Sequence, residues 1–299
     1  MTESGHSSGG GMTARLVAAP RVRRGARQKV GDIVLSVVLI VLSLFMIVPL
    51  VWLITTSVTT RAEAFQLPPR WIPTPPTLAN YAEINSLIPI GRMALNSLIV
   101  SVLATAGALL TSTLAAYAFS RIRFRGGNTL FSVLLAALMV PVQLTVIPLF
   151  ILMRTLGLVD NLAAVWLPAT VNVFGIFFLR QYFASIPRDL DEAARIDGAG
   201  HLRILFQIML PLAMPALSAL TIFLFEATWN NYFWPSIFLQ SNEQMTLPVG
   251  LVQLQGAVGG GPAVVVFAAI TAVVLPVLIL FLIFQRSFVE SIASTGLKA

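Results

Sequence analysis

The polar residues that could do chemistry gather in one short segment between two long apolar runs. In chain order this segment holds Pro187, Asp189, Asp191, Glu192, Gly198 and Gly200. Proline suits the first turn of a helix, and carboxylates in the early turns complement the positive end of the helix dipole. The glycines then permit a sharp turn. The spacing therefore predicts a short helix that ends just before residue 198.

One face of this predicted helix is built from small and mixed side chains. Leu190, Ala193, Ala194 and Asp197 follow the i, i+3, i+4, i+7 spacing of a single helical face. A short helix with such a face and exposed charges is suited to bind in a groove of another protein. The same pattern also fits an amphipathic connector that rests on its own bundle, and the pattern alone does not separate the two.

The chain lacks the motifs with which it could supply the energy for transport by itself. Its two lysines, Lys29 and Lys298, follow Gln28 and Leu297, so no G-x-x-x-x-G-K-[ST] phosphate loop exists. With no cysteine and two histidines, neither a disulfide framework nor a Cys/His metal site is expected. Glu226 is the one carboxylate close to the interior of an apolar run, so a proton or ion relay is nearly absent. Work for uphill transport would come from another chain.

The composition places the chain in lipid. Hydrophobic residues make up 57% of the 299 residues, charged residues 10%, and the mean hydropathy is +0.87. A soluble domain carries about 25% charged residues. About 20 apolar residues are needed to cross a bilayer as a helix. Six runs of this kind are predicted as an all-α set of spans: 33–54, 95–119, 130–153, 158–179, 208–225 and 263–284. Prolines at 141, 148, 168, 215 and 276 predict bent or broken helices among them.

The basic residues predict the orientation of these spans. Fifteen of the 19 lysines and arginines fall on the side that carries both termini, and four fall on the other side. Both termini are therefore expected in the cytoplasm of a multi-pass membrane protein. The net charge of +7 comes from basic residues that lie between the apolar runs. They do not form one face that could follow a phosphate backbone, so no nucleic-acid partner is expected. The predicted parts are a disordered basic tail, 1–30, and a membrane domain, 31–299, with a cytoplasmic loop at about 183–207.

The amino-acid sequence of this loop resembles a motif of a known family. Glu192-Ala193-Ala194, three residues, Gly198, nine residues and then Ile208-Met209-Leu210-Pro211 is similar to the E-A-A-x-x-x-G-x9-I-x-L-P loop of ABC importer permeases. Further stretches resemble the carbohydrate-uptake branch that includes the maltose permease G component. They are 96–97, 115–121, 141–148, 156–160, 228–235 and 284–286.

The resemblance implies a type I ABC importer permease fold and a non-catalytic subunit that moves a sugar or related solute across the plasma membrane of a prokaryote. It implies a second permease subunit, a heterodimer being expected, an ATPase dimer that binds ATP and Mg, an extracytoplasmic solute-binding protein and membrane lipid as partners. No cofactor is expected in this chain. The residues implied in coupling to the ATPase are Asp191, Glu192, Ala193, Ala194, Asp197, Gly198, Ile208, Leu210 and Pro211.

Two further sets of residues are candidates for contact with the solute and with the binding protein. Polar groups and a tryptophan within or near spans could line a solute path: Asn96, Gln143, Asn172, Glu226, Trp229 and Asn230. The same residue types also join helices to one another or lie at the membrane interface. A glycine-rich outer loop between the last two spans could reach the binding protein through Gln253, Gln255, Gly256, Gly259 and Gly260.

Two other classes of protein compete with this interpretation. A self-contained secondary carrier or channel for a small polar solute would transport without an ATPase, and the missing relay disfavours it. A membrane assembly or sensor subunit would bind partners without transporting, and the complete docking loop disfavours it.

Overall fold

The computed structural model describes residues 26–64, 66, 68, 70–258 and 263–296, and the regular structure within these ranges is helical. The chain divides into two compact units, Met1–Leu50 and Val51–Ala299. Most of the predicted tail, 1–30, lies outside the described residues, and its assignment stays a prediction.

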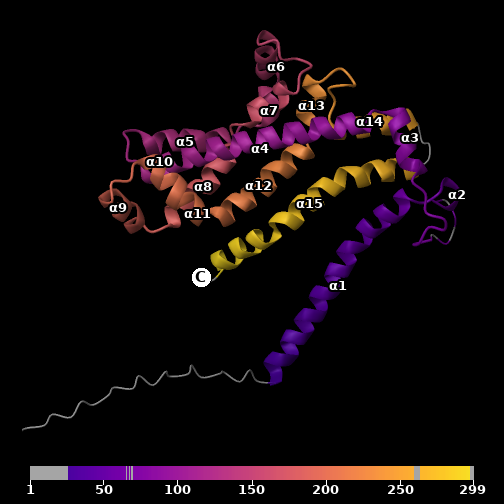
Figure 1. Cartoon of the computed structure of the whole chain (residues 1–299), viewed down its shortest axis with the longest axis horizontal. Helices are drawn as coiled ribbons and strands as arrows, with labels where there is room; N and C mark the ends of the chain where they lie inside the picture. The colour runs from indigo at the N-terminus through magenta and orange to yellow at the C-terminus, as the bar shows by residue number, and fades with distance from the viewer. Residues whose placement is uncertain (1–25, 65, 67, 69, 259–262, 297–299) are drawn as a thin grey trace, which may run out of the picture. The chain divides into compact units, whose positions relative to one another are not determined.

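Helices succeed one another along the chain (Figure 1). In order they are α1 (Ala26–Ser57), α2 (Arg61–Ala64), α3 (Ala79–Leu87), α4 (Ile90–Arg121), α5 (Gly127–Ala137), η1 (Val142–Thr145), α6 (Val146–Thr155), α7 (Ala163–Ala169), α8 (Val173–Ser185), α9 (Asp189–Ile196), α10 (His201–Ile204), η2 (Leu205–Met209), α11 (Leu210–Leu212), α12 (Met214–Trp229), α13 (Phe233–Phe238), α14 (Leu247–Val258) and α15 (Ala263–Gly296).

The predicted spans are present, but two of them are not straight. Among the described residues, four stretches are long and apolar enough to cross a membrane: Ile33–Ser57, Ile90–Arg121, Ala163–Ser185 and Ala263–Ile283. The predicted third and fifth spans correspond to helix pairs that bend by 96° and 80°, and they raise the number to six if each pair is one span. The predicted fourth span was placed too early, because its helical part starts at Ala163 rather than at residue 158.

Prolines account for both bends. Pro141 precedes the 3-10 turn η1, which joins α5 to α6. Pro215 occupies the first turn of α12, directly after the break at Ala213. A proline lacks the N–H that would continue the helix and clashes with the carbonyl four residues earlier, so it tends to begin a new helix. The predicted broken helices at these two positions are confirmed.

Helix α4 is the central element of the second unit. It packs against α7, α8, α12 and α14. Its buried face carries small side chains at near four-residue intervals: Ser97, Ser101, Ala104, Ala108, Ser112 and Ala116. Small residues let helix backbones approach closely where lipid supplies no hydrophobic drive for association. The approach is tight, because a Cβ placed on Gly175 of α8 would lie 2.6 Å from Oγ of Ser112.

Separate apolar clusters lie toward the two ends of α4. Met93 belongs to a buried cluster with Trp229, Leu254 and Val265 from α12, α14 and α15. Tyr117 belongs to another, which includes Phe183 and joins α4 to α8 and to the α9–α12 region. Helix α4 has 32 residues. At a rise of about 1.5 Å per residue, this number corresponds to about 48 Å of helix. A rigid helix of this length therefore connects the two clusters.

The predicted outer loop differs from the structure. Gln253, Gln255 and Gly256 lie within helix α14, which continues to Val258, while Gly259 and Gly260 lie outside the described residues. Leu247, Val249 and Leu254 are buried against α3, α4 and α15. This apolar anchoring makes the first half of the connection helical, which the glycine content did not indicate.

A carboxylate joins two connections that are far apart in the sequence. Asp160, in the turn after α6, accepts hydrogen bonds at Oδ1 from the backbone N–H groups of Gln240 and Ser241, at 2.8 and 2.9 Å, and from the Ser241 hydroxyl. The hydrogen bonds from Ser241 and then Gln240 hold the pKa of Asp160 below its ordinary value. The charged form therefore fastens the α6–α7 turn to the start of the α13–α14 connection.

Candidate functional site

The predicted docking helix is α9, and its two ends are well defined. Arg188 is the N-cap, so Pro187 lies just before the helix rather than in its first turn. At the other end Gly198 has a φ of +80°. Its N–H bonds to the carbonyl of Arg195 at 3.0 Å, and the N–H of Ala199 bonds to the carbonyl of Ala194 at 2.9 Å. These two bonds form a Schellman motif, which ends the helix at the predicted glycine.

The face that the sequence predicted as one is divided in two. Ala194 is 9% exposed and Asp191 is 6% exposed, so these two side chains point into the chain's own bundle. Leu190, Ala193 and Ile196 are exposed, Ile196 to 86%. The reason is that neighbouring helical residues are about 100° apart, so Ala193 and Ala194 can lie on opposite edges of a wide face. The outward face of α9 thus carries Leu190, Glu192, Ala193 and Ile196, and the exposed C-cap residue Asp197 follows them.

A buried ion pair fastens α9 to the end of α4. Nη1 of Arg121 lies 3.2 Å from Oδ2 of Asp191, and the two side chains are 2% and 8% exposed. Nη2 of the same guanidinium donates to the carbonyls of Phe183 and Ile186, at 2.6 and 2.7 Å, and so completes the end of α8. One side chain therefore holds together α4, α8 and α9.

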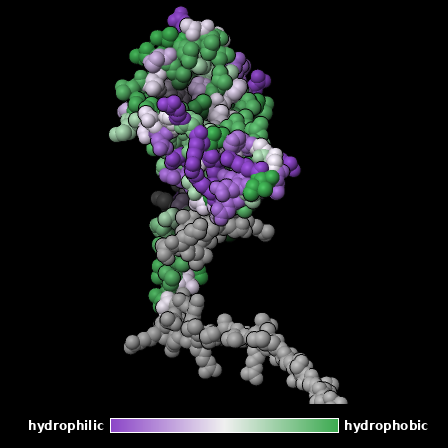
Figure 2. All heavy atoms as spheres, turned by 90° about the vertical axis from the view of Figure 1, so that its left-hand side faces the viewer, coloured by the Kyte–Doolittle hydropathy of each residue, from purple (hydrophilic) through white to green (hydrophobic). Residues whose placement is uncertain are grey.

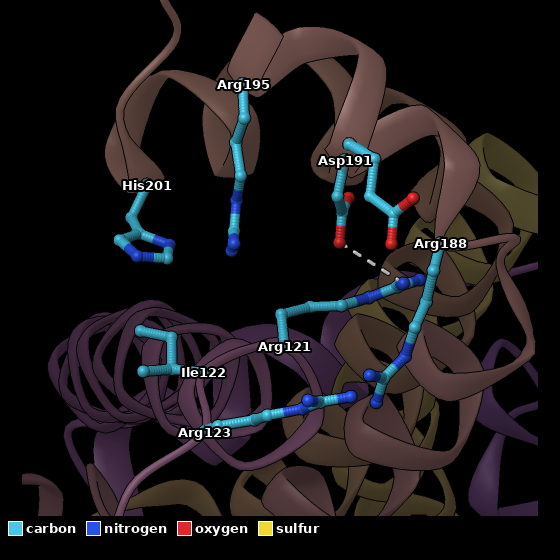
Figure 3. A pocket seen from close by; sticks show the side chains of 8 residues that line it. Arg121, Ile122, Arg123, Arg188, Asp191, Arg195 and His201 are labelled. Atoms are coloured by element: carbon cyan, nitrogen blue, oxygen red, sulfur yellow. Dashed lines mark ion pairs between the residues drawn. The ribbon is translucent and has the colours of Figure 1, made fainter.

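Beside this ion pair lies a polar cavity of about 380 Å³ (Figure 3). Its lining residues are Arg121, Ile122, Arg123, Arg188, Asp191, Glu192, Arg195 and His201. Figure 3 shows Arg188, Asp191 and Arg195 reaching down from the helix and Arg121 and Arg123 extending from the end of α4. His201 Nδ1 lies 3.3 Å from the Tyr117 hydroxyl of α4. The loop is thus joined to α4 at two separated points, through Asp191 of α9 and through His201 of α10.

The last predicted coupling residues lie in the return to the membrane. Ile208 is in the π-helical turn η2, and Leu210 and Pro211 are in α11. Ile208 and Leu210 are partly buried against the cluster that contains Met209 and Leu205, whereas Pro211 is exposed. The apolar residues of this part of the motif therefore anchor the loop to its own bundle.

The side chains of three predicted solute-path residues form hydrogen bonds with other groups of this chain. Nδ2 of Asn96 donates to the carbonyls of Glu243 and Met245, at 2.8 and 2.9 Å. Oδ1 of Asn172 accepts from the N–H of Gly175 and caps α8. Trp229 is 2% exposed, and its Nε1 donates to the carbonyl of Val273 in α15. In the structure Asn96 and Trp229 thus join distant parts of the chain, the alternative that their residue types left open, and Asn172 caps its own helix.

The other three are exposed on this chain. Gln143 lies at the α5–α6 bend. Glu226 lies on the last turn of α12 and Asn230 is the C-cap of this helix, and Nδ2 of Asn230 donates to Oε1 of Glu226 at 2.8 Å. A charged or amide group on a membrane-spanning helix is costly against lipid, so these groups are expected to face water or another subunit.

The sequence did not indicate the role of Arg121. It stands at the end of an apolar run, where an arginine commonly marks topology, and its partner Asp191 is distant along the chain. The row of small buried side chains on α4, from Ser97 to Ala116, was also missed, although its spacing of three or four residues is visible in the sequence. Within the described residues, no group of three or more His, Asp or Glu side chains could hold a metal ion.

The fold and the site define a class of protein. This is a multi-pass helical membrane protein with a rigidly anchored helix presented at one end of its bundle, the arrangement of a permease. The family model of the binding-protein-dependent transport system inner membrane component matches residues 107–294, and the chain belongs to this family.

Curated relatives and a solved structure agree. The chain is 36% identical over 252 residues to the sulfoquinovosyl glycerol transport system permease protein SmoH of Agrobacterium fabrum, covering 84% of this chain and 88% of that protein. It is 39% identical over 203 residues to the arabinooligosaccharides transport system permease protein AraQ of Halalkalibacterium halodurans, covering 68% and 72%. A crystal structure of a bacterial ABC transporter that imports alginate has a chain of 28% identity and TM-score 0.74, covering 89% of this chain and 99% of that one. The predicted fold, a type I ABC importer permease, is confirmed.

Proposed function

We propose that this chain is one permease subunit of an ATP-driven importer that carries a sugar or related solute into the cytoplasm. The observation that carries the proposal is the outward face of α9, held rigidly on a membrane-spanning helix by the buried Arg121–Asp191 pair. The chain has no phosphate loop of its own, so in this proposal the energy of ATP hydrolysis enters through the contact of α9 with a separate ATPase. The names of the relatives, which transport arabinooligosaccharides and sulfoquinovosyl glycerol, support a carbohydrate as the solute.

The proposed partners follow from surfaces that this chain leaves uncovered. An ATPase dimer, which binds ATP and Mg, receives α9 through Glu192, Ala193 and the neighbouring exposed side chains. A second permease covers the apolar elbow between α5 and α6, where Met139 and Ile147 are 84% and 72% exposed. An extracytoplasmic binding protein delivers the solute on the opposite side, near α14 with Gln253, Gln255 and Gly256. Both termini lie in the cytoplasm and the membrane is the plasma membrane.

The structure offers a direct route from α9 to the far end of the bundle. A movement of α9 acts on Arg121 and therefore on the end of α4. Because α4 is one continuous helix, the movement reaches Asn96, which holds the connection before α14 through Glu243 and Met245. Closure of the ATPase dimer would thus tilt α4 and change the access to the solute path as a rigid-body motion.

Reconstitution tests this function. We expect proteoliposomes that contain this chain, the second permease, the ATPase and the binding protein to accumulate a radiolabelled arabinooligosaccharide or sulfoquinovosyl glycerol only when ATP is present on the side of the membrane that carries the ATPase. The matched control omits the ATPase. Uptake by this chain alone under a proton or sodium gradient would contradict the proposal and favour a secondary carrier.

The solute path is proposed to pass the exposed pair on α12. Asn230→Ala removes an amide that the rest of this chain does not bury, so we expect the KM for the transported solute to rise about tenfold, the effect of one lost hydrogen bond to a polar group. The thermal stability of the complex should stay unchanged. Asn96→Ala is the contrasting variant, because loss of its two buried hydrogen bonds should lower stability. An unchanged KM in Asn230→Ala would remove this pair from the path.

A further inference from the structure

A second cavity, which the transport function does not use, lies on the other side of the residues Arg123 and Arg188. It has a volume of about 430 Å³ and lies between the turn that follows α4, the start of α5 and the last turns of α8. Its charged lining residues are Arg121, Arg123, Arg180 and Arg188, and it has no carboxylate in its lining. This distinguishes it from the first cavity, where Asp191 and Glu192 balance part of the charge.

The positive charge of this second cavity is largely unbalanced. Arg121 is paired with Asp191, but Arg123, Arg180 and Arg188 have no ion-pair partner among the described residues. Figure 3 shows the guanidinium groups of Arg123 and Arg188 extending toward one another, where like charges repel. Nε of Arg180 is buried and lacks a hydrogen-bond partner in the described part of the chain. Such an arrangement is stabilised by a bound anion.

The shape of Arg180 suits an oxyanion. Its guanidinium carbon lies 4.0 Å from the centre of the Phe131 ring, so the ring supports the flat side of the group. Because Nε is buried, the two Nη groups remain for hydrogen bonds to two oxygens of one anion, a geometry that suits phosphate. Helix α5 begins after Gly126 without a side-chain cap. The N–H of Gly127 donates to the carbonyl of Phe124, so the N–H groups of Asn128 and Thr129 remain in the first turn and add to the same preference.

The position of the cavity identifies the source of the phosphate. It lies beside the ends of three apolar helices: α4 ends at Arg121, α5 begins at Gly127 and α8 ends at Ser185. Directly beyond it, α5 exposes Leu130 and Val133 to 51% and 61%, spaced three residues apart on one flank. Figure 2 shows hydrophilic and hydrophobic side chains meeting over this end of the bundle. A molecule with a phosphate and acyl chains matches both surfaces.

We propose that this cavity binds the phosphate of an anionic phospholipid such as phosphatidylglycerol, with the acyl chains along α5. A water molecule occupies about 30 Å³ in the liquid. The cavity is more than ten times larger and therefore has room for a phosphoglycerol group and accompanying water. The headgroup links α5 and α8 to Arg188, which is the N-cap of α9. The bound lipid therefore stabilises the base of the docking helix, and the leaflet that faces the ATPase supplies it.

The test uses the complete transporter, delipidated in a non-ionic detergent, and measures binding of dioctanoyl phosphatidylglycerol by calorimetry. Dioctanoyl phosphatidylcholine and inorganic phosphate are the comparison ligands. Arg123→Gln and Arg180→Gln should each weaken phosphatidylglycerol binding about tenfold, the effect of one lost charge-assisted hydrogen bond. Arg125→Gln is the matched control, because Arg125 is exposed two positions away and does not line the cavity. It should change the affinity less than about twofold.

Each other outcome counts against the lipid. Equal weakening by Arg125→Gln would show a diffuse surface-charge effect. Inorganic phosphate that binds as tightly as phosphatidylglycerol would assign the cavity to a free anion. Retained lipid affinity in Arg123→Gln with loss of ATPase association would assign it to a protein contact. Arg123 is exposed, so its replacement leaves the fold intact and keeps the test decisive if Arg180→Gln fails to fold.

Discussion

Arg121→Gln is expected to destabilise the purified transporter by about 3–5 kcal/mol, the usual effect of removing one member of a buried ion pair. The replacement leaves the Asp191 carboxylate, 8% exposed in the folded chain, without its counter-charge. It also removes the two hydrogen bonds that Nη2 donates at the end of α8. The measurement is the free energy of unfolding in denaturant, followed by a signal from the second unit of this chain.

Arg125→Gln is the control for this measurement. Arg125 is exposed and forms no ion pair among the described residues. Its replacement should change the free energy of unfolding by less than about 0.5 kcal/mol, the usual range for a surface substitution.

A double replacement separates charge from packing at this site. If the loss in Arg121→Gln comes from the uncompensated carboxylate, Arg121→Met combined with Asp191→Leu should recover much of the stability, since apolar side chains of similar volume can replace a buried pair. The transporter assembled with this variant should still hydrolyse ATP at its ATPase subunits but couple the hydrolysis poorly to uptake, because α9 would no longer be fixed to α4 by an oriented pair. A single variant as stable as the wild type would refute the proposed anchoring role of Arg121.

Ala193→Trp is expected to reduce association with the ATPase about a hundredfold, equivalent to about 2.7 kcal/mol, while the stability of this chain stays unchanged. Ala193 is exposed on the outward face of α9, so an indole there occupies space that the partner would fill. ATP-driven uptake should fall with the lost association. The measurements are co-purification of the ATPase and uptake in proteoliposomes.

The neighbouring alanine provides the matched control. Ala194 is 9% exposed and packs in the cluster with Tyr117 and Ile204. Ala194→Leu overfills this cluster and should cost about 1–3 kcal/mol of stability. The two variants therefore have opposite expected effects. Ala193→Trp weakens association with the ATPase without changing the stability of this chain, whereas Ala194→Leu lowers the stability of this chain. Normal uptake by Ala193→Trp would mean that the outward face of α9 does not meet the ATPase.

The prediction of membrane spans succeeded where a local pattern was sufficient. Apolar runs long enough for a bilayer lie in α1, α4, α7–α8 and α15, because a backbone in lipid must form helix over such a length. The bends at Pro141 and Pro215 also follow from local chemistry, since proline cannot continue the hydrogen-bond ladder. The bend angles of 96° and 80° were not predictable, because packing against other helices sets them.

Among the candidate site residues, some could be predicted from the sequence and others could not. Gly198 was assigned to a turn because glycine adopts positive φ without steric cost, and its φ of +80° confirms the assignment. Gln253, Gln255 and Gly256 were expected in a loop, and they are helical because Leu247 and Leu254 pack on distant parts of the chain. Trp229 and Asn96 were candidates for the solute path, and their hydrogen-bond partners within the chain come from positions 44 and 147 or more residues away.

The amino-acid sequence by itself determined the membrane location, the all-α fold class and the docking motif of this protein. Each of these depends on residue types and on spacings within a single helix or loop. Only the tertiary structure decided which side of α9 is free and which residue anchors it. The physical reason is that Ala193 and Ala194 have the same intrinsic preferences, and that Arg121 and Asp191 are neighbours solely because α4, α8 and α9 converge at one end of the bundle.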